Sequence, residues 1–322
     1  MRISVALCTY NGEKYIEEQL RSILEQSVSV DEIVVCDDGS TDNTIDIVDR
    51  VLMSGGISYR ILKNDKPLGV SNNFLKALKM STGDYVFTCD QDDIWDVNKV
   101  KVFMAEVKKS RKDLYFSNGI LIDSKGNSLG SSLWDAYLID IKTITEKPLM
   151  EALLKRPIVT GAAMLVSREI INRIDFIPEG VLHDEWFSMI AAASNSIHPL
   201  AQTTFFYRQH GNNVVGAKRE SFFERFNHWL NGFRNLPQLR HKLYLRSKAL
   251  VIAAQNTPYH DLTVKGLDFW NTAKDFESLT RRKQLATATK CLIDKQYHMF
   301  YTGYRGYLRD VLSVFVRQNK CN

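Results

Sequence analysis

Short apolar runs alternate with helix-like stretches over the first 110 residues of the chain. Each run is rich in β-branched or aromatic residues and is followed by turn residues and then by apolar positions at helical spacing. Repeated strand-then-helix units are typical of a parallel α/β sheet. The pattern predicts strands over residues 3–8, 32–36, 59–62 and 85–89.

The pattern changes further along the chain. It predicts a helix over residues 97–109, a strand over 114–117, a hairpin over 120–129, a helix over 149–154 and a strand over 162–167. Beyond residue 218 only amphipathic helices are indicated, such as 221–233. We therefore expect an α/β domain over residues 1–217, with a mixed, mostly parallel sheet flanked by helices, and a helical C-terminal extension over 218–322.

Composition is ordinary for a globular protein, with 44% hydrophobic and 25% charged residues. The five cysteines lack metal-ligand spacing and predict buried thiols in a reducing compartment. No apolar run reaches the length of about 18 residues that a membrane span requires, and polar residues interrupt the first apolar run early. These features predict a cytoplasmic protein without a transmembrane helix.

Charge is distributed unevenly along the chain. Residues 1–217 carry 23 Lys and Arg against 29 Asp and Glu, whereas residues 218–322 carry 19 against 8. Aromatic residues are interleaved with this basic charge: Phe222, Phe223, Phe226, Trp229, Phe233, Tyr304, Tyr307 and Phe315. Two interpretations stay open, peripheral contact with acidic lipid at the inner membrane face and packing of the aromatics on the main domain. No nucleic-acid-binding motif is present, so we expect no nucleic-acid partner.

Three carboxylates follow the predicted strand 85–89 within four residues, at Asp90, Asp92 and Asp93. Clustered acid at the carboxyl end of a strand suits a hard divalent cation such as Mg²⁺ or Mn²⁺ that also contacts substrate phosphates. This predicts a metal-diphosphate site. The alternative is a solvated turn that caps a helix beginning near Ile94.

Four separated blocks, Leu7–Gly12, Val35–Asp42, Asp90–Asp93 and His183–Trp186, occur in the order found in a known enzyme family. Together they resemble the signature blocks of inverting family-two glycosyltransferases with the GT-A fold. The later stretch Tyr207–Gly216 is similar to bacterial rhamnosyltransferases that build cell-surface polysaccharide such as O-antigen or capsule. The resemblance covers about two-thirds of the chain.

The resemblance implies how a nucleotide-sugar donor is bound. Thr9 and Tyr10 would contact the nucleotide, and Asp38, in preference to Asp37, would bind the base. Asn64 belongs to the block that follows the third strand.

Many family members carry an arginine where this chain has Ser71 or Asn72. The resemblance therefore leaves part of the diphosphate contact to Arg208 or His210.

The resemblance also implies a metal ligand and a base. Asp92 would bind the ion directly, with Asp90 near the ribose and the metal, and Asp93 is left out as a helix cap. Asp184 would take the proton of the acceptor hydroxyl, with Glu185 as the competing candidate.

Two neighbours of the base receive lesser roles. His183 would orient the base or contact phosphate, and Trp186 would offer a flat surface to a sugar ring or simply pack. The alternative for this block is a helix N-terminus enriched in acid.

The expected reaction is metal-dependent, inverting transfer of one sugar. The resemblance implies L-rhamnose from dTDP-L-rhamnose, with a UDP-hexose as the alternative donor and a lipid-linked saccharide as the acceptor. The Gln-x-x-Arg-Trp signature of processive members is absent. Two alternatives from other classes stay open, a metal-dependent phosphohydrolase and a noncatalytic nucleotide-sugar-binding scaffold.

Overall fold

A single mixed sheet organises the N-terminal part of the chain. The computed structural model describes residues 1–210 and 235–316. The strand order is β3-β2-β1-β4-β8-β6-β9-β5, and β7 pairs with β6. The strands are β1 (Ile3–Thr9), β2 (Glu32–Asp37), β3 (Ser58–Lys63), β4 (Tyr85–Cys89), β5 (Ile94–Trp95), β6 (Leu114–Ile122), β7 (Ser128–Ser132), β8 (Met164–Ser167) and β9 (Ile197–Arg208).

The central strands are parallel and buried, as the apolar runs predict. Every residue of β1, β2 and β4 is buried. Strand β1 pairs in parallel with both β2 and β4, so that Thr9 lies opposite Asp37. Each antiparallel pairing involves one of the short strands β5, β7 or β8. The predicted mixed, mostly parallel sheet flanked by helices is confirmed.

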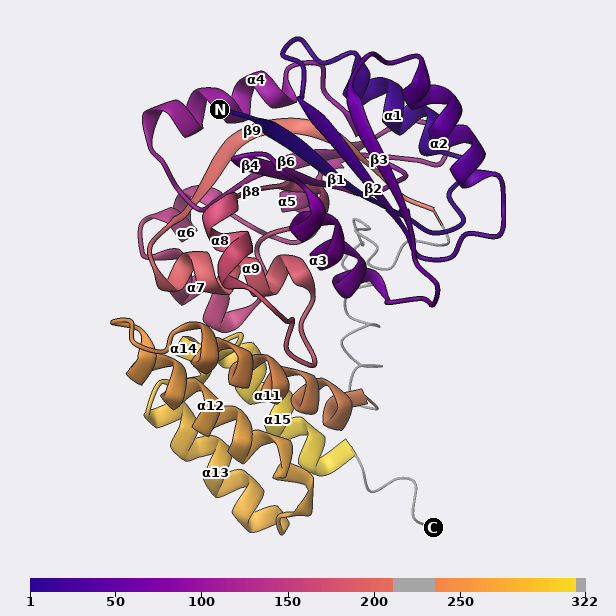
Figure 1. Ribbon diagram of the computed structural model, residues 1–322. Helices are drawn as coiled ribbons and strands as arrows, with labels where there is room; N and C mark the ends of the chain where they lie inside the picture. Colours follow the sequence, from indigo (N-terminus) through magenta and orange to yellow (C-terminus); the bar gives the residue numbers. More distant parts are fainter. Residues whose placement is uncertain (211–234, 317–322) are drawn as a thin grey trace.

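Helices cover both sides of this sheet (Figure 1). In this view α1, α2 and α4 lie above it, and α3, α8 and α9 lie below it. The helices of this part are α1 (Ile16–Leu24), α2 (Thr44–Met53), α3 (Val70–Met80), α4 (Lys99–Lys109), α5 (Leu133–Ala136), α6 (Ile141–Thr145), α7 (Leu149–Lys155), α8 (Arg168–Arg173) and α9 (His183–Ala193), together with the 3-10 turn η1 (Gly161–Ala163). Because β1 to β4 are parallel, their carboxyl ends lie at one edge of the sheet, and this edge is where ligands of open α/β sheets bind.

Three local expectations were wrong. Ile94 and Trp95 form strand β5, which pairs with β9, and the next helix begins only at Lys99, so Asp93 caps no helix there. The predicted strand 114–117 continues without a break into the first strand of the predicted hairpin to form β6, and the hairpin itself is confirmed because β6 pairs antiparallel with β7. Strand β9 was not predicted, because Pro199 and an exposed polar stretch interrupt its apolar pattern, yet it pairs with β6 along its length.

The described C-terminal residues are helical and pack against α7 and α9, on the side of these helices that faces away from the sheet (Figure 1). They form α11 (Leu236–Ala253), α12 (His260–Lys274), the 3-10 turn η3 (Phe276–Ser278), α13 (Arg281–Ile293), α14 (Gln296–Phe300) and α15 (Tyr304–Val316). Leu250, Phe269, Trp270 and Phe300 belong to the same apolar core as the sheet. No helix in the described ranges is both long and apolar enough to cross a bilayer.

Several sequence predictions fall outside the described residues. These are the boundary at residue 217, the helix over 221–233 with its aromatic side chains, and residues 211–216 of the stretch that is similar to rhamnosyltransferases. The boundary therefore stays a prediction.

Candidate active site

A cleft of about 440 Å³ opens where β1 and β4 end and where α3 and α9 begin. This volume lies within the range of small-molecule sites. Seven of the residues predicted from the sequence line it together: Thr9, Tyr10, Asp38, Asp90, Asp92, His183 and Asp184. Asn64, Glu185, Trp186, Arg208 and His210 are not among its lining residues. Residues separated by 175 positions in the chain thus share one concave surface.

Asp37 holds the turn that follows β2. Its Oδ1 accepts a hydrogen bond from the Thr9 hydroxyl at 2.7 Å, and its Oδ2 accepts from the backbone N–H groups of Gly39 and Ser40 at 3.1 and 2.9 Å. Asp37 is therefore a structural anchor of the turn. Tyr10, by contrast, is 57% exposed at the mouth of the cleft.

Asp38 fixes the loop that leads into α3. Its Oδ1 accepts hydrogen bonds from Asn64 Nδ2 at 2.8 Å and from the Leu68 N–H at 2.7 Å, and its Oδ2 accepts from the Gly69 N–H at 2.9 Å. Asn64 also donates to Asn73. Each carboxylate oxygen has two lone pairs, so Oδ2 keeps one for a ligand. Asn64 therefore supports the cleft wall through Asp38.

Gln91 joins the acidic loop to the end of β1, a role that the sequence did not indicate. Its Oε1 accepts from the Tyr10 N–H at 2.8 Å, and its Nε2 donates to the Tyr10 carbonyl at 3.0 Å. A Cβ atom on Gly12 would lie 2.2 Å from Gln91 Oε1, so this approach requires glycine. The two loops are thereby held in a fixed register.

Asp90, Asp92 and Asp93 are concentrated at the end of β4. Burial, and after it the nearby carboxylates of Asp92 and Asp184, raise the pKa of Asp90 to about 7. Burial also raises the pKa of Asp93 well above its usual value, and Asp93 Oδ1 accepts from the Arg208 N–H at 3.0 Å. Closely spaced buried carboxylates resist ionisation together unless a cation is present.

These oxygen donors fit a divalent cation. No group of three or more His, Cys, Asp or Glu side chains within the described ranges surrounds a single ion position. An ion bound by one or two carboxylates completes its coordination with substrate phosphates and water, which is the usual arrangement for Mg²⁺.

A buried lysine lies beneath the acidic loop. Lys99 Nζ donates to the Ala162 carbonyl at 2.8 Å and lies 4.3 and 4.7 Å from the ring centroids of Trp95 and Phe205. Burial lowers its pKa to about 8. The sequence did not single out Lys99, because only the structure shows that this charged residue of α4 is buried. It balances part of the acidic charge and holds the turn η1.

The turn η1 positions Asp184. Asp184 Oδ2 accepts from the Gly161 N–H at 3.0 Å, and its Oδ1 accepts from the Glu185 N–H at 2.8 Å. The Thr88 hydroxyl donates to the Gly161 carbonyl and, at 3.2 Å, to the Met164 carbonyl. Burial raises the pKa of Asp184 to about 6. A carboxylate held in place with a raised pKa is suited to accept a proton.

Glu185 and Trp186 lie away from the cleft. Both Glu185 and Arg246 of α11 are buried, and Arg246 Nε donates to Glu185 Oε2 at 2.9 Å. Trp186 is buried with its ring centroid 6.4 Å from that of Phe176. The structure therefore places neither Glu185 nor Trp186 in the cleft lining, although both were predicted to contact substrate. Of the two candidates for the base, Asp184 lines the cleft and Glu185 does not.

The Glu185–Arg246 pair predicts a specific stability pattern. Replacing Arg246 with Met should lower the free energy of unfolding by about 3–5 kcal/mol, because it leaves a buried carboxylate unpaired. The double replacement Glu185→Leu with Arg246→Met should recover most of this loss, since two apolar side chains can replace a buried pair at little cost. Urea denaturation measures both. Equal destabilisation of the single and double variants would contradict the prediction.

Arg208 and His210 do not line the cleft, but both contact Asp92. Arg208 Nε donates to the Asp92 carbonyl at 2.8 Å, and its Nη2 forms an ion pair with Glu18 at 2.5 Å. His210 Nε2 lies 2.8 Å from Asp92 Oδ2, and its ring stacks on Tyr15. Both side chains therefore contact the acidic loop.

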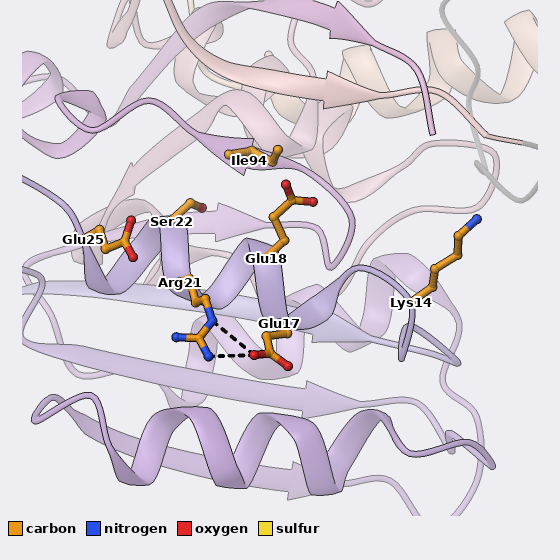
Figure 2. A pocket seen from close by; sticks show the side chains of 7 residues that line it. All are labelled: Lys14, Glu17, Glu18, Arg21, Ser22, Glu25 and Ile94. Carbon is orange, nitrogen blue, oxygen red and sulfur yellow. Dashed lines mark hydrogen bonds and ion pairs between the residues drawn. The ribbon is translucent and has the colours of Figure 1, made fainter. Parts of the chain in front are cut away.

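A second hollow, of about 550 Å³, lies along α1 and is lined by seven residues (Figure 2). Glu17 and Arg21 form an ion pair within it, and Glu18 lies beside them. None of the residues predicted from the sequence lines this hollow. It holds none of the carboxylates that follow the strands, so the cleft at the strand ends is the better candidate for chemistry.

Comparison with known proteins gives the family. The model for "Glycosyl transferase family 2" matches residues 4–175, more than half of the chain. The chain belongs to glycosyl transferase family 2. The dTDP-rhamnosyl transferase RfbG of Shigella flexneri is 32% identical over 218 residues, which cover 66% of this chain and 74% of RfbG.

A second similar protein is the UDP-Glc:alpha-D-GlcNAc-diphosphoundecaprenol beta-1,3-glucosyltransferase WfgD of Escherichia coli. It is 30% identical over 122 residues, which cover 38% of this chain and 47% of WfgD.

Solved structures agree with the family on the fold. Residues 1–349 of S. aureus TarS in complex with UDP-GlcNAc superpose with a TM-score of 0.61 at 17% identity, covering 98% of this chain and 89% of that one. The mannosyltransferase PcManGT of Pyrobaculum calidifontis, in complex with GDP-Man and Mn²⁺, has a TM-score of 0.52 at 18% identity, covering 99% and 87%. The predicted GT-A fold and glycosyltransferase class are confirmed.

Proposed function

We propose that this family-two glycosyltransferase transfers L-rhamnose from dTDP-L-rhamnose to a saccharide acceptor during synthesis of a bacterial surface polysaccharide, with inversion and with a divalent cation. The observation that carries this proposal is the convergence of Asp38, Asp90, Asp92 and Asp184 on one cleft. Similarity to a dTDP-rhamnosyl transferase over 74% of its length supports the donor. The similarity to WfgD supports a UDP-hexose as the second candidate donor.

Residues of the β1 and β2 ends would hold the nucleotide. Tyr10, at the cleft mouth, offers an aromatic face to the base, and the free lone pair of Asp38 Oδ2 can accept an N–H from a pyrimidine. Asp92, with Asp90 beside it, would hold Mg²⁺ or Mn²⁺, and such an ion when bound neutralises charge on the leaving diphosphate. Arg208 and His210 would keep Asp92 in position.

Asp184 would act as the base in a single displacement. Its carboxylate takes the proton of the acceptor hydroxyl while that oxygen forms a bond to the anomeric carbon. The bond from the anomeric carbon to the diphosphate oxygen breaks, and its electron pair leaves with the nucleoside diphosphate. Attack from the face opposite the leaving group inverts the anomeric centre.

Thermal-shift titration tests the donor. Native protein is titrated with dTDP-L-rhamnose, UDP-glucose and UDP-GlcNAc in the presence of Mn²⁺ or Mg²⁺, and stabilisation reports binding by mass action. We expect the largest shift with dTDP-L-rhamnose, followed by transfer to a saccharide acceptor. Preference for a UDP-sugar would favour the second donor. Hydrolysis of simple phosphate esters without transfer would favour the phosphohydrolase, and donor binding without turnover would favour the scaffold.

A lipid-linked acceptor at the inner membrane face is part of the proposal. Four apolar residues of α15 share one helix face and are each at least 40% exposed: Tyr304, Leu308, Leu312 and Phe315. Exposed Arg305 lies at the edge of this face. An apolar stripe flanked by basic residues suits an anionic lipid surface. We expect salt-sensitive cosedimentation with anionic vesicles and none with neutral ones. Equal cosedimentation with anionic and neutral vesicles would contradict peripheral binding to an anionic lipid surface.

A further inference from the structure

His183 is the first residue of α9 and lines the cleft beside Asp184. Its side chain is 4% exposed. The imidazole ring stacks on Phe74 of α3, with ring centroids 4.1 Å apart and planes inclined by 18°. The His183 N–H donates to Ser71 Oγ at 3.2 Å. Contacts from α3 therefore fix both the backbone and the ring plane of this residue.

Both ring nitrogens of His183 are buried, and neither has a hydrogen-bond partner among the described residues. The adjacent Asp184 carboxylate forms no hydrogen bond with the ring nitrogens of His183, and it accepts instead from the N–H groups of Gly161 and Glu185. Leaving a buried polar atom unpaired costs stability, and an apolar ring of similar shape would avoid that cost. A polar ring at this position therefore needs an explanation other than packing.

The charge state of the His183 ring indicates which class of ligand it can bind. Burial lowers its pKa to about 3, so the ring is neutral at physiological pH. A neutral imidazole has one N–H donor and one nitrogen acceptor. A hydroxyl group likewise donates once and accepts, whereas a phosphate oxygen only accepts and is best met by a cation. The chemistry of the ring thus matches a sugar hydroxyl.

Gly161 lets the His183 ring lie close against the turn η1. A Cβ atom at Gly161 would lie 2.8 Å from His183 Nε2 and 3.8 Å from Asp184 Oδ2. The backbone at Gly161 has no positive φ, so its conformation alone does not require glycine. The missing side chain allows this close approach, and Gly161, His183 and Asp184 line the cleft together.

We propose that His183 binds a hydroxyl of the sugar that is transferred, and thereby orients that sugar for attack by the acceptor. The inference rests on the proposed function, since it assumes a nucleotide-sugar donor in the cleft. The donor sugar is favoured over the acceptor because His183 packs on α3, and the loop that leads into α3 is held by Asp38 on the nucleotide side of the cleft. His183 therefore lies between that wall and Asp184.

The decisive variant is His183→Phe, which keeps an aromatic ring on Phe74 and removes both nitrogens. Calorimetric titration with Mn²⁺ present compares binding of dTDP-L-rhamnose with binding of dTDP. We expect the Kd for the nucleotide-sugar to rise about tenfold, since one hydrogen bond is lost. Binding of dTDP should be unchanged, and the Tm without ligand should equal or exceed that of the native protein.

A second variant, His183→Gln, restores a donor and an acceptor and should recover part of the nucleotide-sugar affinity. Native affinity for dTDP-L-rhamnose in His183→Phe would overturn the inference, and so would equal weakening of both ligands with a lower Tm, which indicates a structural role. Unchanged donor affinity with a raised KM for the acceptor would overturn the assignment to the donor sugar. If native protein bound neither ligand nor any UDP-sugar, the proposed function itself would fail.

Discussion

Replacing Asp184 with Asn should lower kcat for glycosyl transfer by about 10²–10⁴-fold, the range usual for loss of a positioned general base. An amide cannot take the proton of the attacking hydroxyl at neutral pH. Donor affinity should stay near the native value, because Asn keeps the size of the side chain and can still accept from the Gly161 N–H. Initial rates at saturating donor and acceptor, with calorimetry for donor binding, give both quantities.

Glu185 provides the matched control for this experiment. Glu185→Gln alters the neighbouring carboxylate but lies in the buried pair with Arg246, so transfer by the folded enzyme should be retained while stability falls. The reverse result, transfer lost in Glu185→Gln and retained in Asp184→Asn, would assign the base to Glu185.

The pH profile gives an independent measure of the same group. Because burial raises the pKa of Asp184 to about 6, the ionised form that accepts a proton predominates above that pH. Below pH 6 the carboxyl is protonated, and kcat/KM of the native enzyme should fall about tenfold for each further pH unit. Any residual activity of Asp184→Asn should lack this limb. An acidic limb that persists unchanged in the variant would exclude Asp184 as its source.

Replacing Asp92 with Asn should also nearly abolish transfer, with a loss of at least about 100-fold, because stabilisation of a leaving diphosphate by a bound ion contributes several kcal/mol. An amide oxygen is a neutral and weaker ligand for a hard cation than a carboxylate. Activity should require a higher concentration of Mn²⁺, so rates are measured over a titration of the ion. Chelation of the ion in native enzyme should give a comparable loss.

Asp65 offers the control for this second variant. It is exposed in the loop after β3 and does not line the cleft, so Asp65→Asn removes one carboxylate with little effect on rate or metal dependence. If Asp92→Asn kept the native rate and the native Mn²⁺ dependence, the assignment of Asp92 as a metal ligand would be wrong.

Much of the site could be predicted because the sheet is parallel. Buried strands of β-branched residues are recognisable from the sequence, and parallel strands bring their carboxyl ends to one edge. Thr9 ends such a strand, and Asp38 and Asp90 each follow one, so local patterns were enough to predict that they lie close together. Strand β9 was missed because its pattern is broken, although its pairing with β6 brings Arg208 to Asp93 and Asp92.

Sequence by itself determined the four strands β1 to β4 with helical segments between them, the acidic loop and the family resemblance, all of which depend on residues near one another in the chain. Tertiary structure alone decided which carboxylate faces the cleft. Asp184 and Glu185 are adjacent in sequence, but successive residues of an α-helix point about 100° apart. Asp184 therefore contacts Gly161 and lines the cleft, whereas Glu185 pairs with Arg246, which lies 61 positions away in the sequence. Lys99 and His183 acquire their significance in the same way, from the distant groups that surround them or fail to pair with them.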